Sequence, residues 1–569
     1  MSISGRLFFL PRIFTKHTTN TETYPIVSIK LKYTYFLLFL LVMPSAVWPS
    51  QNETIPTYHW AYADLAQLQL YGYLPDLFLS NQPFTKGEVA RALIQLKTRV
   101  KQERLSLDPT SSAIVNRLEI YLGPEIAQIE KKGETAPSEW LAPGERLRIG
   151  AIVEQDFVHR KNFSKFRGIY RSQIDYSPIP DITAFNTINF DQYLGDDPTY
   201  TGKRWRGITG YTEQAYIRAF LPIFPNSRQN GNDRRSLWVM FGRDFLKWGP
   251  GVTGQLYFSD AARPMDQFSF RYRNRWLQYT FVTAQLENFA LPESFRRQFQ
   301  TGVAHRFLSA HRLDMRFKNR IYFGISEGVL YGGPDEYLNF AYLNPMVFYH
   351  GEQLNKSGSG NTMGSVDISI YPGRKVKLYG TLLIDDIQLE KTGPGDLEPG
   401  ENGWLTGIQK ADPFGLNGLF LGAEYVKIKN RTYKTAHPWE WWEHWHKPLG
   451  YYLGSDLDHL MLQASYWSDK NFVVDLQWHH IRRGEGRLSK PWDQPWMSRT
   501  LAQGYHEKFP TGIVETTSRL TLNFRYFFRT NFQLVGNLSA YSKKNVDNVA
   551  GADETGREGK VGIWWEGRF

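Results

Sequence analysis

Residues 249–254 read GPGVTG and match the pattern G-x-G-x-x-G, in which glycines bring the backbone close to the pyrophosphate of a dinucleotide. That chemistry requires a buried apolar strand before the turn and a helix after it, because the phosphate rests on the N-terminus of the helix. The preceding residues, LWVMFGRDFLKW, mix charges into a strand pattern, and the following ones contain Pro264 and then alternate like a strand. We therefore expect no nucleotide site here, but a structured loop between two strands.

Charged and aromatic residues flank the glycines on both sides. They are Arg243, Asp244, Lys247, Trp248, Asp260 and Arg263. A tryptophan ring stacks on a sugar, and paired hydrogen bonds from charged side chains bind its polar groups, so these residues are candidates for glycan binding. The alternative is that ion pairs, such as one between Arg243 and Asp260, pin a loop that folds inward. The sequence leaves both interpretations open.

Histidine and glutamate residues cluster in HPWEWWEHWHKP, residues 437–448. His444 and His446 are two residues apart, so they would share one face of a strand. Glu440 or Glu443 could then complete a set of metal ligands. The four tryptophans of the segment favour an aromatic-rich extracellular loop or an interfacial girdle instead, and we expect no metal site.

Neighbouring carboxylates at Asp385 and Asp386, followed by Glu390, could suggest acid–base catalysis. Adjacent residues of a strand point to opposite faces, so the aspartate pair cannot simply act together. No Ser-His-Asp ordering stands out, and the absence of cysteine excludes thiol catalysis, disulfides and cysteine-ligated metal sites. The histidines of HHIRRGEGR (479–487) are typical of a strand end that runs into a charged loop. We expect a protein that is not an enzyme and has no cofactor.

The composition favours strands and turns. Phe, Tyr and Trp make up 15% of the 569 residues, and 48 residues are glycine, which suits sheets and turns better than long helices. The mean hydropathy of −0.45 argues against a bundle of apolar membrane helices. Basic and acidic residues are interspersed despite a net charge of +11, which argues against nucleic-acid binding.

The first fifty residues predict export. Within residues 1–50, Lys30 and Lys32 precede an apolar run from Tyr33 to Val42, and small residues follow, which is the layout of a secretory signal. The run is about half the length of a membrane-spanning helix. The segment ahead of Lys30 is long for a signal and suggests a misassigned start codon.

Residues 51–135 predict a small α-helical domain. Thr85 and Glu88 have the spacing of a capping box, and the apolar residues that follow them recur at helical intervals. A further helical segment is expected to break or kink at Gly123-Pro124. Residues 133–145 are rich in proline and glycine and are expected to form a linker.

From residue 136 to residue 569 the periodicity becomes alternating. In SRLTLNFRY, Leu520 and Leu522 point to one face and Thr521 and Asn523 to the other. Such strands build either a soluble sandwich or propeller, or an outer-membrane barrel whose apolar face meets lipid and whose polar face lines a lumen. At roughly 24 residues per strand and loop, this region gives a mostly β fold, a large antiparallel barrel of about 16–18 strands.

The chain ends on GKVGIWWEGRF. Ile563 and Trp565 lie on one side of a terminal strand, and Phe569 is the last residue. The segment resembles the C-terminal signal of bacterial outer-membrane barrels, in which a final aromatic residue and alternating apolar residues are read by the barrel-insertion machinery. Gly567 departs from that pattern, because an apolar residue is usual at its position.

The stretch around the glycines resembles the capsule-assembly family Wzi, in which a Gly-Arg strand leads to a Trp-Gly-Pro-Gly loop and then to a serine and an Arg-Pro pair. The matching residues here are Gly242-Arg243, Trp248-Gly249-Pro250-Gly251, Ser259 and Arg263-Pro264. Further similarity lies in IYFGISEGVLYGG (321–333), YLNPMVFYHGEQ (342–353), LYGTLLIDDIQ (378–388), LGSDLDHLMLQASY (453–466) and the helical region with YGYLPD and PFTKGEVARAL.

The resemblance implies an eighteen-stranded barrel in the outer membrane of a Gram-negative-type bacterium, with the helical domain on the periplasmic side. It implies a protein that binds capsular polysaccharide or exopolysaccharide and keeps it attached to the cell. Its further partners would be outer-membrane lipid and the insertion machinery, and we expect a monomer. The alternative function is that of an outer-membrane porin or transporter for small or sugar solutes, with the loop narrowing the lumen.

Overall fold

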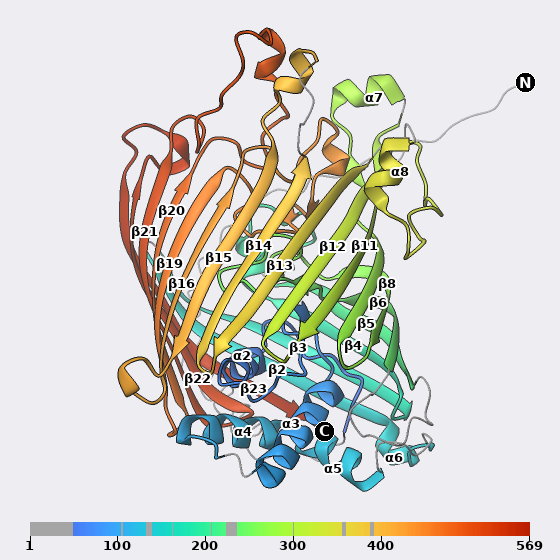
Figure 1. Ribbon diagram of the computed structural model, residues 1–569, viewed down its shortest axis with the longest axis vertical. Coiled ribbons are helices and arrows are strands. Elements are labelled where there is room, and N and C mark those ends of the chain that lie inside the picture. The colour runs from blue at the N-terminus through green and yellow to red at the C-terminus, as the bar shows by residue number, and fades with distance from the viewer. Residues whose placement is uncertain are drawn as a thin grey trace, which may run out of the picture. The chain divides into compact units, whose positions relative to one another are not determined.

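The computed structural model describes residues 49–103, 106–132, 139–161, 163–205, 208–222, 236–299, 301–355, 360–386 and 392–569. The signal predicted in residues 1–50 lies outside these residues, apart from its last two positions. In the described residues one sheet of 19 strands includes the two-residue β10 (Phe289–Ala290), and the other 18 strands form a closed antiparallel wall (Figure 1). This confirms the predicted barrel and its favoured strand number.

The barrel closes where its first and last wall strands pair, from Gly150 opposite Arg568 to His159 opposite Gly559. The wall strands are β2 (Leu147–Arg160), β3 (Phe163–Ile179), β4 (Ile182–Asp191), β5 (Thr209–Pro222), β6 (Ser236–Asp244), β8 (Met265–Arg273), β9 (Leu277–Gln285), β11 (Val303–Phe317), β12 (Ile321–Gly333), β13 (Asn361–Gly373), β14 (Val376–Asp386), β15 (Glu401–Ala411), β16 (Leu419–Ile428), β19 (Leu457–Trp467), β20 (Phe472–Arg483), β21 (Glu515–Arg529), β22 (Phe532–Lys544) and β23 (Glu554–Arg568).

The alternation predicted for these strands matches the two faces of the wall. In β21, Leu520 points outward and is 47% exposed, whereas Thr521 points into the barrel and is buried. Asn523, also inward, donates a hydrogen bond of 3.1 Å to Asp475 of the neighbouring strand. An apolar outer face and a hydrogen-bonded polar interior are the arrangement expected of a barrel that spans a membrane.

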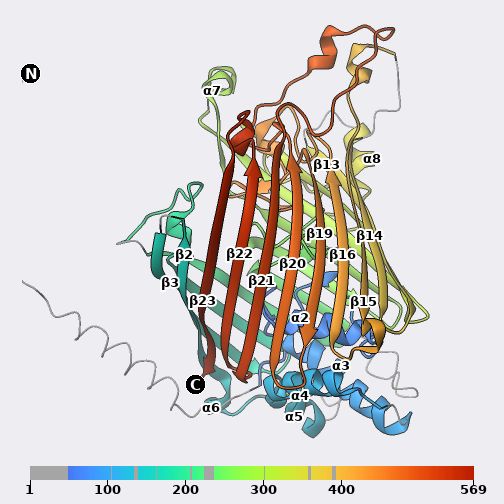
Figure 2. The ribbon, with the colours of Figure 1, turned by 90° about the vertical axis from the view of Figure 1, so that its left-hand side faces the viewer.

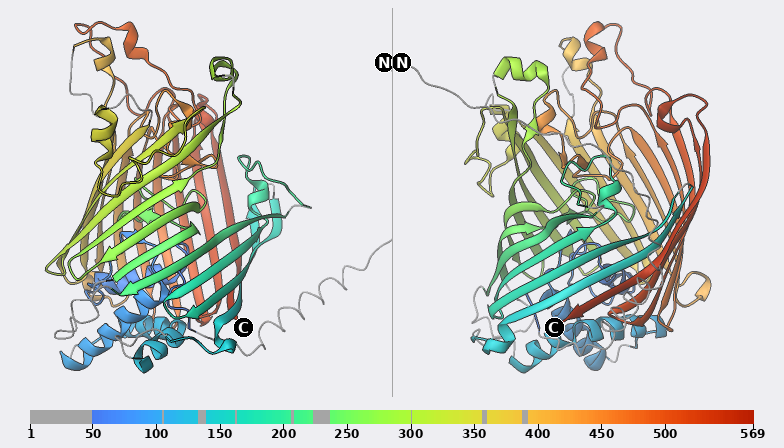
Figure 3. Two further views of the ribbon diagram at one scale, coloured as in Figure 1. Left: turned by 90° about the vertical axis from the view of Figure 1, so that its right-hand side faces the viewer. Right: turned by 180° about the vertical axis from the view of Figure 1, so that it is seen from behind.

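The helices of the N-terminal region gather at one end of the barrel, which we call the helix rim (Figures 2 and 3). They are α2 (Ala61–Leu70), α3 (Lys86–Gln102), α4 (Pro109–Tyr121) and α5 (Gly123–Lys132). The predicted capping box is present at the start of α3, where Glu88 N donates to Thr85 Oγ1 and Thr85 N donates to Glu88. The predicted break falls between α4 and α5. Among the described residues, no helix is long and apolar enough to cross a membrane.

The helices and the inner wall share one hydrophobic core at this rim. Leu65, Leu68 and Leu93 are fully buried in it. Wall residues from around the barrel complete it, namely Ile152, Tyr322, Tyr371, Phe420, Trp467, Phe527 and Trp564. Because the core reaches strands on many sides of the barrel, the helices pack against the inside of the wall and close the helix rim.

Long loops occupy the opposite end, which we call the loop rim. They carry α7 (Glu293–Phe299) and α8 (Tyr349–Asn355), seen at the top of Figure 1. Short helix α6 (Pro143–Arg146) leads from the helical region into the first wall strand. The helices α2–α5 therefore fall within the predicted residues 51–135, and the wall strands within 136–569.

The end of the chain extends the wall by one residue. Phe569 and Ile149 each donate a backbone hydrogen bond to the other, at 2.7 and 3.2 Å. The ring of Trp565 lies across Gly567, where an added Cβ would be 2.2 Å from the ring. The departure of Gly567 from the terminal pattern thus has a structural reason, since only glycine leaves room for this ring.

Candidate functional site

Residues 245–264, between β6 and β8, fold into the lumen and are called the inward loop. The loop includes β7 (Lys247–Trp248), which pairs with β1 (Asn81–Gln82) of the helical region. Gly249 N also donates to Ser80 O at 2.8 Å. Residues 255–264, which directly follow the glycines and are all described, form no helix, as predicted. The loop ties the helical region to the barrel from inside.

The glycine turn is bound to the far wall by a carboxylate. Glu424 of β16 accepts hydrogen bonds from the backbone amides of Val252 and Thr253, at 2.7 and 2.8 Å, and from Tyr379 OH at 2.9 Å. An added Cβ on Gly251 would be 2.1 Å from Gly254 O, so glycine is required where the turn folds back on itself. The turn thus binds an anion, and that anion belongs to the protein's own wall.

A second segment, residues 429–456 between β16 and β19, packs on the inward loop. Trp442 is fully buried, with its ring 5.4 Å from that of Phe258, and its Nε1 donates to Tyr257 O. Tyr433 OH donates to Leu256 O at 2.6 Å. The two segments form an aromatic layer across the lumen, which we call the lumen plug.

Two of the predicted site residues are buried in this arrangement. Trp248 is 1% exposed, and its ring is parallel to that of Tyr257 at 6.0 Å. Asp244 is also 1% exposed and accepts hydrogen bonds from Gln214 Nε2 and from the backbone of Phe245, both at 2.8 Å. Both side chains hold the loop in place in the structure.

The expected ion pair between Arg243 and Asp260 is replaced by two others. Arg243 forms a two-pronged ion pair with Asp266, because these residues lie directly opposite each other across β6 and β8. Asp260 accepts from Lys247 Nζ at 3.0 Å. Arg243 and Asp266 thus join the two strands that flank the inward loop, and Lys247 and Asp260 join two points within it.

Among the predicted site residues, Arg263 packs on aromatic rings at a partly open surface. Its guanidinium lies over the rings of Tyr200, Tyr211 and Trp445, at 5.2, 5.2 and 5.4 Å from their centroids. The ring of Trp445 is 40% exposed. Such a sandwich fixes the guanidinium and leaves an aromatic face open beside a positive charge.

The loops that carry Tyr200 and Trp445 also supply further basic and aromatic residues at the loop rim. Lys447 Nζ pairs with Asp197 at 2.7 Å, and Trp205 is 69% exposed. We call Tyr200, Trp205, Arg263, Trp445 and Lys447 the rim patch. The sequence interpretation included Arg263 but missed the others, because three separate loops bring them together. The tryptophans of the 437–448 segment were the available signal.

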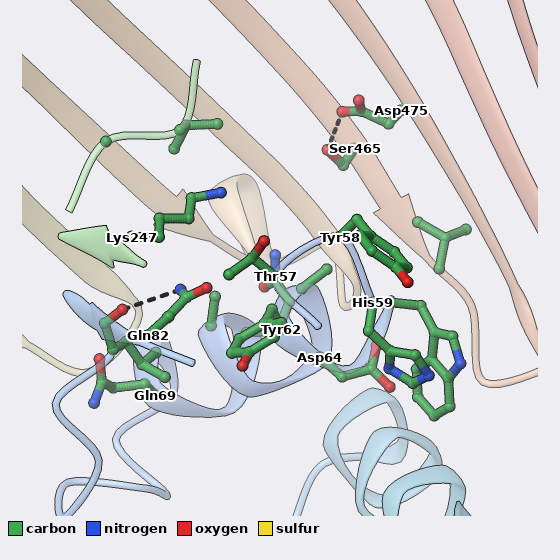
Figure 4. A pocket seen from close by; sticks show the side chains of 18 of the residues that line it. Thr57, Tyr58, His59, Tyr62, Asp64, Gln69, Gln82, Lys247, Ser465 and Asp475 are labelled. Atoms are coloured by element: carbon green, nitrogen blue, oxygen red, sulfur yellow. Dashed lines mark hydrogen bonds between the residues drawn. The ribbon is translucent and has the colours of Figure 1, made fainter. Parts of the chain in front are cut away.

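A chamber of about 840 Å³, lined by both polar and apolar side chains, lies below the inward loop. Figure 4 shows α2 on one side of it, Lys247 across from the helix, and Ser465 with Asp475 on the wall. The Ser465 hydroxyl donates to Asp475 at 2.5 Å. The chamber is bounded by the helical region and by the inward loop. The helical region lies between the chamber and one end of the barrel, and the lumen plug lies between the chamber and the other end.

Of the candidate metal ligands, His444 and Glu440 have partners within the protein, and His446 is exposed. His444 lies 2.6 Å from Glu287. Burial opposes the charge of Glu287, but the hydrogen bond from His444 and the charge of Arg306 hold the pKa of its carboxyl below the ordinary value. Glu440 accepts from Thr435 at 2.8 Å. Among the described residues, no three His, Cys, Asp or Glu side chains are placed to hold a metal ion.

The paired carboxylates of the sequence also have a structural contact. Asp385 accepts a hydrogen bond from the backbone amide of Tyr433, in the second segment of the lumen plug. Asp386 follows it at the end of β14 and is exposed. Glu390 lies outside the described residues. Asp385 therefore holds a loop against the wall, and Asp386 does not share this contact.

The comparisons with known proteins agree on the architecture. Residues 235–557 match the family model of the capsule assembly protein Wzi. The structure of Wzi, an outer membrane protein involved in group 1 capsule assembly in Escherichia coli and a carbohydrate-binding β-barrel, has a TM-score of 0.56 at 16% identity, covering 90% of this chain and 98% of that one.

Two further solved structures are less similar. OccD3 (OpdP) and OpdK of Pseudomonas aeruginosa have TM-scores of 0.42 and 0.40 at 8% and 9% identity, covering 76% and 75% of this chain and 94% and 100% of theirs. No curated protein sequence gives a significant match. The family model covers more than half of the residues and confirms the resemblance seen in the sequence, so the chain belongs to the capsule assembly protein Wzi family.

Proposed function

We propose that the protein is a non-enzymatic outer-membrane barrel that binds capsular polysaccharide or exopolysaccharide at its loop rim and retains it at the cell surface. The observation that carries the proposal is the rim patch, in which Arg263 and Trp445 present a charge and an open ring side by side. Family membership and the carbohydrate binding of the Escherichia coli protein support it.

The chemistry of the rim patch suits long surface polysaccharides. An aromatic face stacks on the apolar face of a sugar ring, and Arg263 and Lys447 attract the carboxylates of acidic sugars. Each contact is weak, but a polymer offers many repeats of the same unit, so its attachment is strengthened by multivalency. The protein acts as a monomer in this account, and its lipid-facing wall holds it in the membrane.

The lumen favours binding over transport. The helices close one rim, and the lumen plug crosses the barrel with buried aromatic rings, including Trp248 and Trp442. A diffusion porin or sugar transporter needs a continuous water path. The Glu424 carboxylate and the pairing of β1 with β7 fix the inward loop at both of its sides, which opposes that alternative.

Binding of the purified protein to a polysaccharide array tests the proposal. We expect the double variant Arg263→Ala, Trp445→Ala to lose binding at least about ten-fold, since each well-placed contact of this kind contributes of the order of 1 kcal/mol. The matched control is Arg275→Ala, Trp276→Ala, which removes a similar stacked pair, 4.7 Å apart, from a turn at the helix rim. Equal binding by both variants and the unaltered protein would contradict the proposed site.

A further inference from the structure

An ionisable pair stands on the outer face of the wall. His311 of β11 and Glu327 of β12 are directly opposite each other, with Nε2 and Oε2 3.2 Å apart. Their neighbours in sequence, Arg312 and Ser326, point into the barrel and are hydrogen-bonded to each other there. Because successive side chains of a strand alternate, His311 and Glu327 point outward, toward the side that the barrel presents to lipid.

A long connection covers this pair from outside. Residues 334–355, between β12 and β13, are called the outer-wall loop. Within it, the backbone amides of Tyr349 and His350 donate to Glu327 at 3.2 and 2.9 Å, and the Tyr349 ring stacks on His311 at 4.8 Å. Tyr279, outward on β9, donates its hydroxyl to Pro345 O. The loop is thus hydrogen-bonded to the outer wall itself.

Burial of the wall confirms where the loop lies. Outward residues beneath it are nearly inaccessible: Val329 is 0% and Tyr331 1% exposed, and both pack with Tyr349 of the loop. Outward residues beside it remain open, as in Ile325 at 42% and Val366 at 38%. Figures 1 and 2 show α8, at the end of this loop, outside the strands near the loop rim.

The other side of the outer-wall loop is apolar and open. Its large side chains have the following exposed fractions: Tyr337 76%, Phe340 82%, Met346 82%, Phe348 65% and Leu354 74%. Monomeric soluble proteins rarely expose such a group of apolar side chains, and one of this kind marks a contact with a partner or a membrane. This surface is continuous with the open outward residues of β12 and β13, such as Ile325, only two positions from Glu327.

We propose that the outer-wall loop is a membrane-contacting element. Its apolar side chains insert among the acyl chains of the outer leaflet, while its inner side seals the His311–Glu327 pair from lipid. A charged or hydrogen-bonding pair at this depth is costly when it faces hydrocarbon, so the loop provides the polar and aromatic cover that lipid cannot. The inference rests on the proposed outer-membrane location and assigns the outer-wall loop to the lipid contact.

The absence of cysteine from the chain allows a direct test. Single variants Met346→Cys and Phe348→Cys of the full chain are labelled with bimane and reconstituted into phosphatidylcholine vesicles that carry doxyl groups on their acyl chains. Ile325→Cys is the control for the lipid-facing wall, and Trp205→Cys is the control for the aqueous loop rim. Iodide in the buffer reports exposure to water.

We expect doxyl lipids to quench the probes at Met346 and Phe348 as strongly as the probe at Ile325. Iodide is expected to quench only the probe at Trp205. Quenching of the loop probes by iodide, as at Trp205, would overturn the proposal. If neither quencher reached the loop probes, and a pyrene label on Phe348→Cys formed excimers, a second copy of the protein would cover this surface. That result would also overturn the proposal. If the Ile325 probe itself escaped doxyl quenching, the proposed membrane location would fail as well.

Discussion

The carboxylate of Glu424 binds the backbone amides of Val252 and Thr253, 172 and 171 residues away in the sequence, at 2.7 and 2.8 Å. Successive amides of a glycine-rich turn form an anion site, which is why the pattern G-x-G-x-x-G suggests phosphate binding. Here a carboxylate from the opposite wall occupies that position. The same local chemistry therefore serves to fasten a loop inside a barrel.

Removing this carboxylate is expected to loosen the lumen plug. Glu424→Ala leaves two amides and the Tyr379 hydroxyl without their partner, at a cost of about 1.5–3 kcal/mol for each hydrogen bond to a charged group. We expect frequent channel openings in planar bilayers, against few or none for the unaltered protein. Glu293→Ala, in exposed helix α7, is the control. A Glu424→Ala variant that showed no more channel openings than the unaltered protein would indicate that the loop is held mainly by its aromatic packing.

Trp248→Ala separates the two interpretations of the inward loop. Because Trp248 is 1% exposed, its truncation is expected to lower the stability of the plug by about 3–5 kcal/mol, as for other buried aromatics. Polysaccharide affinity of the folded variant is expected to stay unchanged. Thermal unfolding and array binding check both parts, and Trp445→Ala is expected to give the reverse pattern. Lost affinity with intact stability in Trp248→Ala would favour a glycan contact there.

Glu125 is expected to make the helical region more stable in mild acid. Burial raises the pKa of its carboxyl to about 7, from an ordinary value of 4.5, although the amide of Ser50 donates to it. The folded protein therefore keeps a proton that the unfolded chain loses, so the contribution of Glu125 to stability falls as the pH rises from about 4.5 to about 7.

The variant Glu125→Gln keeps the hydrogen bond and removes the titration. Its unfolding temperature relative to the unaltered protein is expected to rise between pH 5 and pH 8. Glu130→Gln, exposed on the same helix, is expected to show no such change. An identical pH dependence in Glu125→Gln and the unaltered protein would rule out Glu125 as the source.

The terminal residues are expected to act in membrane insertion. Phe569→Ala removes the final aromatic residue, whose ring contacts Trp565 at 6.3 Å. We expect less heat-modifiable, folded barrel in outer-membrane fractions, with unfolded chain accumulating in the periplasm. Phe528→Ala removes an exposed aromatic side chain near the end of β21 at the same rim and serves as the control. Equal yields of both variants would argue against a terminal signal.

The sequence predicted the barrel because strand alternation is a local property. A period of two along each segment is set by which side chains face water or lipid, as for Leu520 and Thr521. The capping box at Thr85 and Glu88 is equally local, since its partners are three residues apart. These features needed no knowledge of the tertiary structure.

The interior could not be predicted in the same way. The burial of Trp248 depends on its pairing with Asn81, and the position of the inward loop depends on Glu424. The partner of Arg243 was also missed, since the register of β6 and β8 decides that it meets Asp266. Trp445 and Arg263 stood apart in the sequence, and only the closed barrel brings their loops together.

The most direct test of the central claim is the partition of polysaccharide in cells that lack the gene. If the protein retains polysaccharide, total polysaccharide is unchanged in these cells while the cell-attached fraction falls and the released fraction rises. The unaltered gene is expected to restore attachment, and the Arg263→Ala, Trp445→Ala variant, present at the same level in the membrane, is not. An unchanged ratio of attached to released polysaccharide in the deletion strain would contradict retention as the function.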